Sequence, residues 1–280
     1  MNHIVWIVLD SARYDTFAAA STPNLDRVAR AERRWSYASW TVPSHHAYLV
    51  GLTPHHNRPG RSAASEYRRD LGRWPERVGR RVLAPADPGT FLPELSVPRF
   101  LGKLGYRSEA YVSLPVLNPS TLVAGYFDHF ELMPAHNDLA AILKRVEFGA
   151  EPRFYFINTG ETHYPYLLPG EDGSTFPRLS GVHGTFRHLG DFLAHPHDRD
   201  EDGTEAFGAV TLRAFWEKQV ACIEHLDRVV GTLLDRAPRN LWLMVTSDHG
   251  EMFGEDGFFG HGPVMHEKVF EVFFLEGLAP

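Results

Sequence analysis

The sequence predicts an α/β protein, a three-layer sandwich in which helices cover both faces of a mostly parallel central sheet. Residues 4–9, 154–158 and 241–246 are continuous apolar runs rich in β-branched or aromatic side chains, as in strands buried on both faces. Residues 209–234 carry apolar side chains at helical spacing. Strands that alternate with helices favour parallel pairing through right-handed crossovers.

The remaining elements follow from local signals. Ser21 or Thr22 is expected to cap a short helix that continues to Ala29. Residues 43–50 are expected to form a helix that ends at Gly51 and begins just after Thr41. A helix at 100–104 and a strand at 108–113 are also expected, and all 280 residues are assigned to one catalytic domain. Residues 55–90 and 170–208 break the α/β pattern and are predicted to be surface insertions.

Composition limits the class of protein. The 28 Lys and Arg against 35 Asp and Glu give a net charge of -7, so no general attraction to nucleic acid or to an anionic membrane is expected. The apolar run at 4–9 is far shorter than the roughly 20 residues of a membrane span and lacks the features of a signal peptide. Cys222 is the only cysteine, which excludes an internal disulfide and fits a cytoplasmic location.

Polar residues follow three of the predicted strands. Asp10 follows the first, residues 161–163 follow the second, and Asp248 with His249 follows the third. Because the carboxyl ends of parallel strands share one edge of the sheet, these groups are expected to converge on one divalent ion. Taken alone, the Asp-His-Gly tripeptide favours the simpler interpretation of a turn cap beside a surface histidine.

Longer segments change that balance. Residues 8–13, 21–26, 40–55 and 247–261 together resemble, in order, the motifs of the sulfatase family within the alkaline phosphatase superfamily. The resemblance brackets nearly the whole chain, although residues 55–153 match in outline only. It implies an alkaline phosphatase-like core without the full C-terminal subdomain of sulfatases. Two alternatives follow for the site: a second copy of the chain completes it, or it is open to a bulky substrate.

The resemblance implies that Asp10, Asp248 and His249 bind the metal and that Thr41 is both nucleophile and ligand. Sulfatases convert a cysteine or serine at that position to formylglycine, and threonine cannot be converted in this way. Threonine is used by phosphodiesterases and phosphotransferases of the superfamily. A metal-dependent hydrolase of small anionic phosphate monoesters or diesters is therefore expected. The alternatives are a phosphotransferase, a sulfuric-ester or phosphonate-ester hydrolase, and an anion-binding relative without catalysis.

The resemblance also bears on the metal. Ser11 stands where many sulfatases have a further aspartate ligand, and this loss favours manganese or zinc, with calcium or magnesium left open. His163 and His261 occupy positions that hold the oxygens of the transferred group. One metal ion is expected, and the alternative is a second ion near His163 and His261.

Three further side chains have two interpretations each. Arg13 binds the substrate anion or pairs with a carboxylate such as Asp15. His45 replaces an arginine that supports the nucleophile's turn in the family, and either takes over that role beside the substrate or faces solvent. Ser44 is the rival nucleophile and ranks below Thr41.

Overall fold

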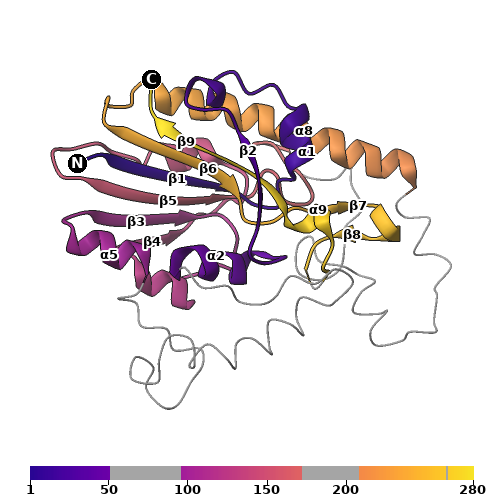
Figure 1. Ribbon diagram of the computed structural model, residues 1–280, viewed down its shortest axis with the longest axis horizontal. Helices are drawn as coiled ribbons and strands as arrows, with labels where there is room; N and C mark the ends of the chain where they lie inside the picture. The colour runs from indigo at the N-terminus through magenta and orange to yellow at the C-terminus, as the bar shows by residue number, and fades with distance from the viewer. Residues whose placement is uncertain (51–95, 172–207, 263) are drawn as a thin grey trace, which may run out of the picture.

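The computed structural model describes residues 1–50, 96–171, 208–262 and 264–280 (Figure 1). Its main sheet has seven strands in the order β2-β9-β6-β1-β5-β3-β4. Their bounds are His3–Leu9 (β1), Glu32–Trp35 (β2), Arg107–Val112 (β3), His129–Leu132 (β4), Arg153–Thr159 (β5), Leu241–Ser247 (β6) and Glu271–Leu278 (β9). The five strands from β6 to β4 are parallel, whereas β9 runs antiparallel to both β6 and β2.

Helices cover both faces of this sheet, as predicted. On one face α1 (Tyr14–Ala19), α6 (Leu139–Leu143) and α8 (Ala209–Leu234) lie over the sheet, and on the other α2 (Thr41–Val50) and α5 (Val97–Lys103) do (Figure 1). Strand β1 divides its side chains between the two layers, because successive residues of a strand point to opposite faces. Val5, Ile7 and Leu9 enter the first core, whereas Trp6 and Val8 enter the second. The three-layer α/β prediction is confirmed.

The local predictions differ in accuracy. Helix α8 spans the predicted residues, while α2 begins at Thr41, two residues before the predicted start. The helix predicted to follow Thr22 is only a 3-10 turn, Leu25–Arg27. The carboxylate of Asp227 accepts from the backbone N–H groups of Asn24 and Leu25, at 3.1 and 2.9 Å. The sequence predicts Ser21 or Thr22 as the cap. In the structure the capping side chain is instead Asp227 of α8.

Two other predictions concern regions that the structure describes only in part. The end of α2 at Gly51, the predicted insertion at 55–90 and most of the one at 170–208 lie outside the described residues. Among the residues that are described, no helix combines the length and the apolar character that crossing a membrane would require.

Candidate metal centre

The predicted polar groups lie at the carboxyl ends of three adjacent strands. Leu9 at the end of β1 pairs with Thr159 of β5 on one side and with Ser247 of β6 on the other, so the three strands end level with one another. Asp10 and Asp248 are therefore the next residues along neighbouring strands. The first turn of α2 adds Thr41 to the same edge, as the sequence predicts.

Asp10, Asp248 and His249 each offer one ligand atom, and these atoms lie within 4.8 Å of one another. His249 Nε2 is 3.4 Å from Asp248 Oδ2 and 3.8 Å from Asp10 Oδ1. All three side chains are buried, and Asp248 Oδ2 has no hydrogen-bond partner among the described residues. Burial and then the nearby Asp10 carboxylate raise the pKa of Asp248 well above its usual value. A divalent cation would remove both penalties, so the donor set fits a metal ion.

The orientation of His249 suits a ligand. Its Nδ1 lies 2.9 Å from the carbonyl oxygen of Gly250, which can only accept, so Nδ1 carries the proton. Burial lowers the pKa of His249 to about 4, and the ring is therefore neutral near pH 7. The lone pair of Nε2 then points toward the two carboxylates, as metal binding requires.

Thr41 places its hydroxyl against this cluster. Its Oγ1 is 3.4 Å from both Asp10 Oδ2 and His249 Nε2. As the first residue of α2, it also lies at the positive end of that helix. The rival hydroxyl of Ser44 instead donates to the carbonyl oxygen of Asp248 at 2.8 Å and approaches that of Ala38 at 3.3 Å. Ser44 therefore holds backbone segments together, and of these two hydroxyl groups it is that of Thr41 which lies at the ligand cluster.

His45 contacts the first turn of α2, which carries Thr41. Its side chain is fully buried, which rules out the solvent-facing alternative. Nδ1 donates to the carbonyl oxygen of Thr41 at 2.8 Å and lies 3.8 Å from Asp248 Oδ2. Burial lowers the pKa of His45 to about 4, so the ring is neutral. These contacts place His45 against the turn that carries Thr41, where the sequence predicts a supporting role for it.

Arg13 takes the ion-pair alternative. Its buried guanidinium donates to Asp15 at 2.8 Å, to Glu255 at 2.6 Å and to the carbonyl oxygen of Glu251 at 3.1 Å. The predicted ion pair with Asp15 is therefore present, and the alternative of substrate binding by Arg13 stays a prediction. Its role is to tie the loop after β1 to the loop after β6.

His163 and His261 lie beside the cluster. His163 Nε2 is 4.0 Å from Asp10 Oδ1, and the ring centroid of His261 is 5.2 Å from that of His163 and 4.3 Å from that of His249. Nδ1 of His261 lies 3.3 Å from Glu251 Oε1. The structure thus brings both predicted histidines to the centre.

Several residues of the centre were not predicted from the sequence. Asn158 Nδ2 donates to Asp10 Oδ2 at 2.9 Å, and the backbone N–H of Ser11 donates to Asp248 Oδ1 at 3.2 Å. Glu251 is buried against His261 and Tyr166. The one signal available was the polar Asn158 near the end of an otherwise apolar strand.

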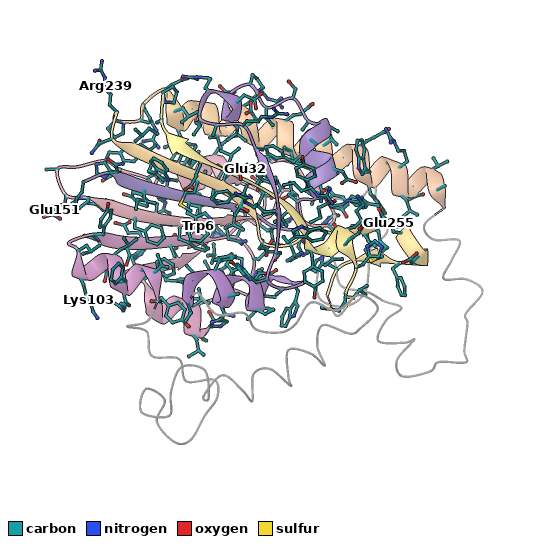
Figure 2. The ribbon with its side chains drawn as sticks, in the orientation of Figure 1. Trp6, Glu32, Lys103, Glu151, Arg239 and Glu255 are labelled. Carbon is teal, nitrogen blue, oxygen red and sulfur yellow. The ribbon has the colours of Figure 1, made fainter. Side chains whose placement is uncertain are left out.

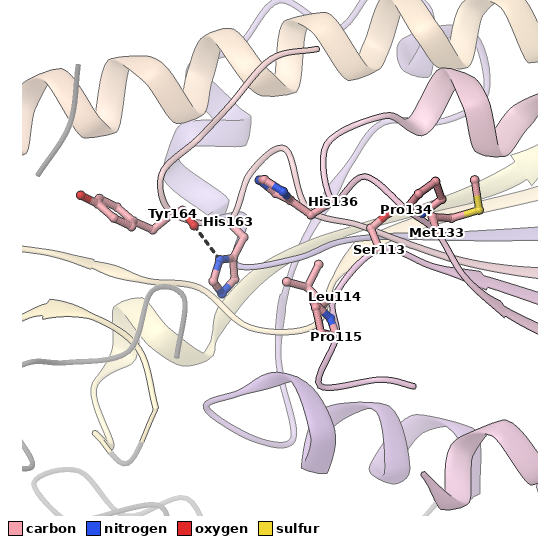
Figure 3. Close-up of a pocket in the computed structure, with 8 residues that line it drawn as sticks. All are labelled: Ser113, Leu114, Pro115, Met133, Pro134, His136, His163 and Tyr164. Carbon is pink, nitrogen blue, oxygen red and sulfur yellow. Dashed lines mark hydrogen bonds between the residues drawn. The ribbon is translucent and has the colours of Figure 1, made fainter. Parts of the chain in front are cut away.

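A cavity of about 140 Å³ adjoins the centre at His163 (Figure 3). The cavity is formed where β3, β4 and β5 end. Figure 3 shows the hydrogen bond between Nδ1 of His163 and the carbonyl oxygen of Tyr164, which is 2.9 Å long. Figure 2 shows the side chains of the described residues around the sheet. We call this space the lateral cavity. Its lining residues are Ser113, Leu114, Pro115, Met133, Pro134, His136, His163 and Tyr164.

Fold and geometry define an α/β protein with a candidate metal centre at the carboxyl edge of a mostly parallel sheet. The sulfatase family model matches residues 2–268, and the chain belongs to this family, within the alkaline phosphatase superfamily. No curated protein matches its sequence.

Solved structures with the same fold have low sequence identity. The C-terminal periplasmic domain of the phosphoethanolamine transferase EptC from Campylobacter jejuni is 12% identical, with a TM-score of 0.57 over 98% of this chain and 79% of that one. The phosphonate monoester hydrolase of Agrobacterium radiobacter is 14% identical, with a TM-score of 0.60 over 99% and 68%. The Escherichia coli EptC domain in complex with Zn is 13% identical, with a TM-score of 0.59 over 99% and 73%.

Proposed function

We propose that this protein hydrolyses phosphate esters, with Thr41 as the nucleophile and a divalent ion held by Asp10, Asp248 and His249. The observation that carries the proposal is the position of Thr41 Oγ1, 3.4 Å from two of these ligands at the start of α2. Formylglycine chemistry has no precursor at position 41, because this position holds threonine and neither cysteine nor serine. The only cysteine, Cys222, lies in α8 with its thiol against the carbonyl oxygen of Tyr166.

The reaction would proceed by two displacements at phosphorus. A bound divalent ion supplies positive charge that favours the ionised threonine hydroxyl and offsets charge on the phosphoryl oxygens. Thr41 Oγ1 attacks phosphorus, the bond from phosphorus to the ester oxygen breaks, and the leaving group takes up a proton. Water then attacks the phosphothreonine, and the bond from phosphorus to Oγ1 breaks. The N-terminus of α2 stabilises negative charge throughout.

The other residues of the centre orient these groups. His45 fixes the carbonyl of Thr41 and with it the first turn of α2. Asn158 and Ser11 each hold one carboxylate. His163 and His261 flank the space beside Asp10 and are proposed to contact the remaining oxygens of the substrate.

Zinc or manganese is the proposed ion. One imidazole with two carboxylates is a donor set that both of these metals accept, whereas calcium prefers an all-oxygen set of six to eight ligands. The relative from Escherichia coli that was solved in complex with Zn supports this choice.

The test compares the wild type with Thr41→Ala and, as the matched control, Thr41→Ser, each loaded with manganese or zinc. Thr41→Ala should lose about 10³-fold or more in turnover of aryl phosphates because the attacking oxygen is gone. Thr41→Ser keeps an oxygen at that position and should retain measurable turnover. Metal content of all three proteins, measured by plasma mass spectrometry, should be equal.

Two results would contradict the proposal. One is near wild-type turnover by Thr41→Ala, and the other is faster turnover of an aryl sulfate than of the matched aryl phosphate. Intact-mass analysis after rapid quenching should find a gain of one phosphoryl group on the wild type and none on Thr41→Ala. Added glycerol separates hydrolysis from transfer, since a transferase would form glycerol phosphate in place of inorganic phosphate.

A further inference from the structure

Two buried residues beside the metal centre, Glu251 and Tyr166, form a chain of contacts that ends on His261. Oε1 of Glu251 lies 3.3 Å from Nδ1 of His261, and the hydroxyl of Tyr166 donates to Oε2 of the same carboxyl group at 2.5 Å. Glu251 and Tyr166 are fully buried, and His261 is 3% exposed. None of the roles described above uses this chain of contacts.

The backbone at Tyr166 is held in an unusual conformation. Its φ of 58° lies in the left-handed region, which is unfavourable for a residue with a side chain. The N–H of Tyr166 donates to the carbonyl oxygen of His163 at 2.8 Å, and the thiol of Cys222 donates to the carbonyl oxygen of Tyr166 at 3.4 Å. Such conformations persist only where the surroundings fix them, and they concentrate at functional sites. The turn that carries His163 therefore also fixes Tyr166.

A second residue with this conformation approaches the same ring nitrogen. Oγ of Ser11 lies 3.4 Å from Nδ1 of His261, and the φ of Ser11 is 61°. Among the described residues other than glycine, only Ser11, Tyr166 and Asp256 have a positive φ. Two of these three unfavourable conformations thus belong to residues whose contacts lead to His261, which indicates that the orientation of this one ring matters.

Contacts at one nitrogen of an imidazole ring decide what the other nitrogen does. They fix the direction in which Nε2 points and determine which of the two nitrogens carries the proton. The ring centroid of His261 lies 4.3 Å from that of His249 and 5.2 Å from that of His163, so the ring that is held in this way lies at the metal centre. Partners of this kind orient the groups that bind a metal ion or a substrate.

We infer that Glu251 and Tyr166 are positioning residues, which hold His261 in the orientation in which its Nε2 contacts an oxygen of the transferred phosphoryl group. The inference rests on the proposed function for the contact between His261 and the substrate. It assigns no proton transfer to Glu251 or Tyr166, because their effect on the reaction passes through His261.

A double-mutant cycle on the manganese-loaded protein tests this dependence on His261. Tyr166→Phe removes only the hydroxyl and should lower kcat for 4-nitrophenyl phosphate about tenfold. In the His261→Ala background the same change should alter kcat by less than about twofold, because the ring through which it acts is absent. An equal loss in both backgrounds is expected of a purely structural role and would overturn the inference.

Tyr111→Phe is the matched control. Tyr111 is also buried, and its hydroxyl donates to Oε2 of the buried Glu109 at 2.9 Å, so this variant too removes a hydrogen bond to a buried carboxyl group. Its kcat should stay within about twofold of the wild type, although thermal unfolding should show a loss of stability similar to that of Tyr166→Phe. An equal loss of kcat in the two variants would show that destabilisation alone explains the effect.

Glu251 is tested by two substitutions. Glu251→Gln keeps a hydrogen-bonding group toward each neighbour and should keep kcat within about threefold of the wild type. Glu251→Ala removes both contacts and should lower kcat about 10- to 100-fold. Metal content, measured by plasma mass spectrometry, should be equal in both variants and the wild type. If Glu251→Gln lost as much activity as Glu251→Ala, the carboxyl group would not act by holding the ring.

Side-chain 15N NMR of the metal-free protein gives a result that does not depend on turnover. The signals of His261 are assigned by their absence from His261→Ala. In the wild type one ring nitrogen should be protonated and the other not, whereas in Tyr166→Phe the two signals should move toward each other as the ring samples both tautomers.

The two proposals fail separately. If the wild type hydrolyses no phosphate ester, the proposed function is wrong, and the NMR spectrum still decides whether Tyr166 and Glu251 hold the ring. Averaged signals of His261 in the wild type, or identical signals in the wild type and Tyr166→Phe, would overturn the inference about these two residues.

Discussion

Glu161 provides a test of the structure that is independent of metal and substrate. Glu161 lies in the loop after β5, and its carboxyl group is fully buried. Its Oε1 accepts from the backbone N–H of Leu139 at 2.8 Å, and its Oε2 accepts from the hydroxyl of Thr159. Burial raises the pKa of Glu161 from 4.5 to about 7, against the opposing effect of these hydrogen bonds. The folded protein therefore holds this proton at a pH at which the unfolded chain releases it.

The sign and size of the effect follow from that difference. Below pH 4.5 both states are protonated, so Glu161 adds no pH dependence. Between pH 4.5 and about 7 only the unfolded chain loses the proton, and the free energy of unfolding must fall as the pH rises. The span from 4.5 to about 7, at about 1.4 kcal/mol per pH unit, predicts a loss of about 3 kcal/mol. Above this window the contribution is constant.

The assay is urea unfolding of the wild type and Glu161→Gln at several pH values from 4 to 8, in the presence of a chelator. The amide of Gln matches the protonated carboxyl in shape and cannot titrate. The stability of the wild type relative to Glu161→Gln should therefore fall by about 3 kcal/mol across the window. The exposed Glu151→Gln is the control and should follow the wild type. A constant difference between the wild type and Glu161→Gln would refute the argument that this carboxyl is buried and protonated.

Two further predictions concern the metal centre, and a third concerns the packing of the loop after β6. Chelation should abolish hydrolysis and addition of manganese or zinc should restore it, so full activity in metal-free protein would contradict the metal assignment. Asn158→Ala should weaken metal binding about 10- to 100-fold in titration calorimetry, because it removes the amide that orients Asp10. Gly250→Ala would place a Cβ 2.1 Å from the carbonyl oxygen of Lys268 and should lower the free energy of unfolding by more than about 2 kcal/mol. Gly149→Ala, with open space around the new Cβ, is the control and should lower it little; thermal unfolding of both variants measures the difference.

The sequence was informative where a pattern has one dominant cause. Strands β1, β5 and β6 were predictable because each is a short, continuous apolar run that is followed at once by polar residues. This pattern is typical of a parallel strand buried on both faces. Helix α8 was predicted with its approximate bounds, since apolar side chains recur at helical spacing along most of its length. Strand β2 could not be predicted. All four of its residues, Glu32–Trp35, are exposed, and it is held by backbone pairing with β9, which leaves no hydrophobic pattern.

Side-chain partners from distant parts of the chain account for the remaining differences. The 3-10 turn Leu25–Arg27 is capped by Asp227, which is about 200 residues away in the sequence, so no local rule identifies the cap. Arg13 had two chemically equivalent types of partner, a substrate anion or protein carboxylates, and the structure shows two carboxylates beside it, those of the nearby Asp15 and the distant Glu255. The lateral cavity depends on the ends of three strands and has no sequence motif at all.

Ser11 illustrates what is gained when a ligand is replaced. Against the sulfatase pattern it is a lost carboxylate, which favours a smaller and less oxygen-rich coordination sphere. In the structure its backbone N–H donates to Asp248 Oδ1 at 3.2 Å, and its hydroxyl lies 3.3 Å from Asp10 Oδ1 and 3.4 Å from His261 Nδ1. Its φ of 61° is what turns the N–H toward the centre. A residue without a carboxylate thus holds both carboxylates of the candidate centre. If Asp10, Asp248 and His249 bind the ion as proposed, two acidic ligands and one imidazole would suit zinc or manganese better than calcium.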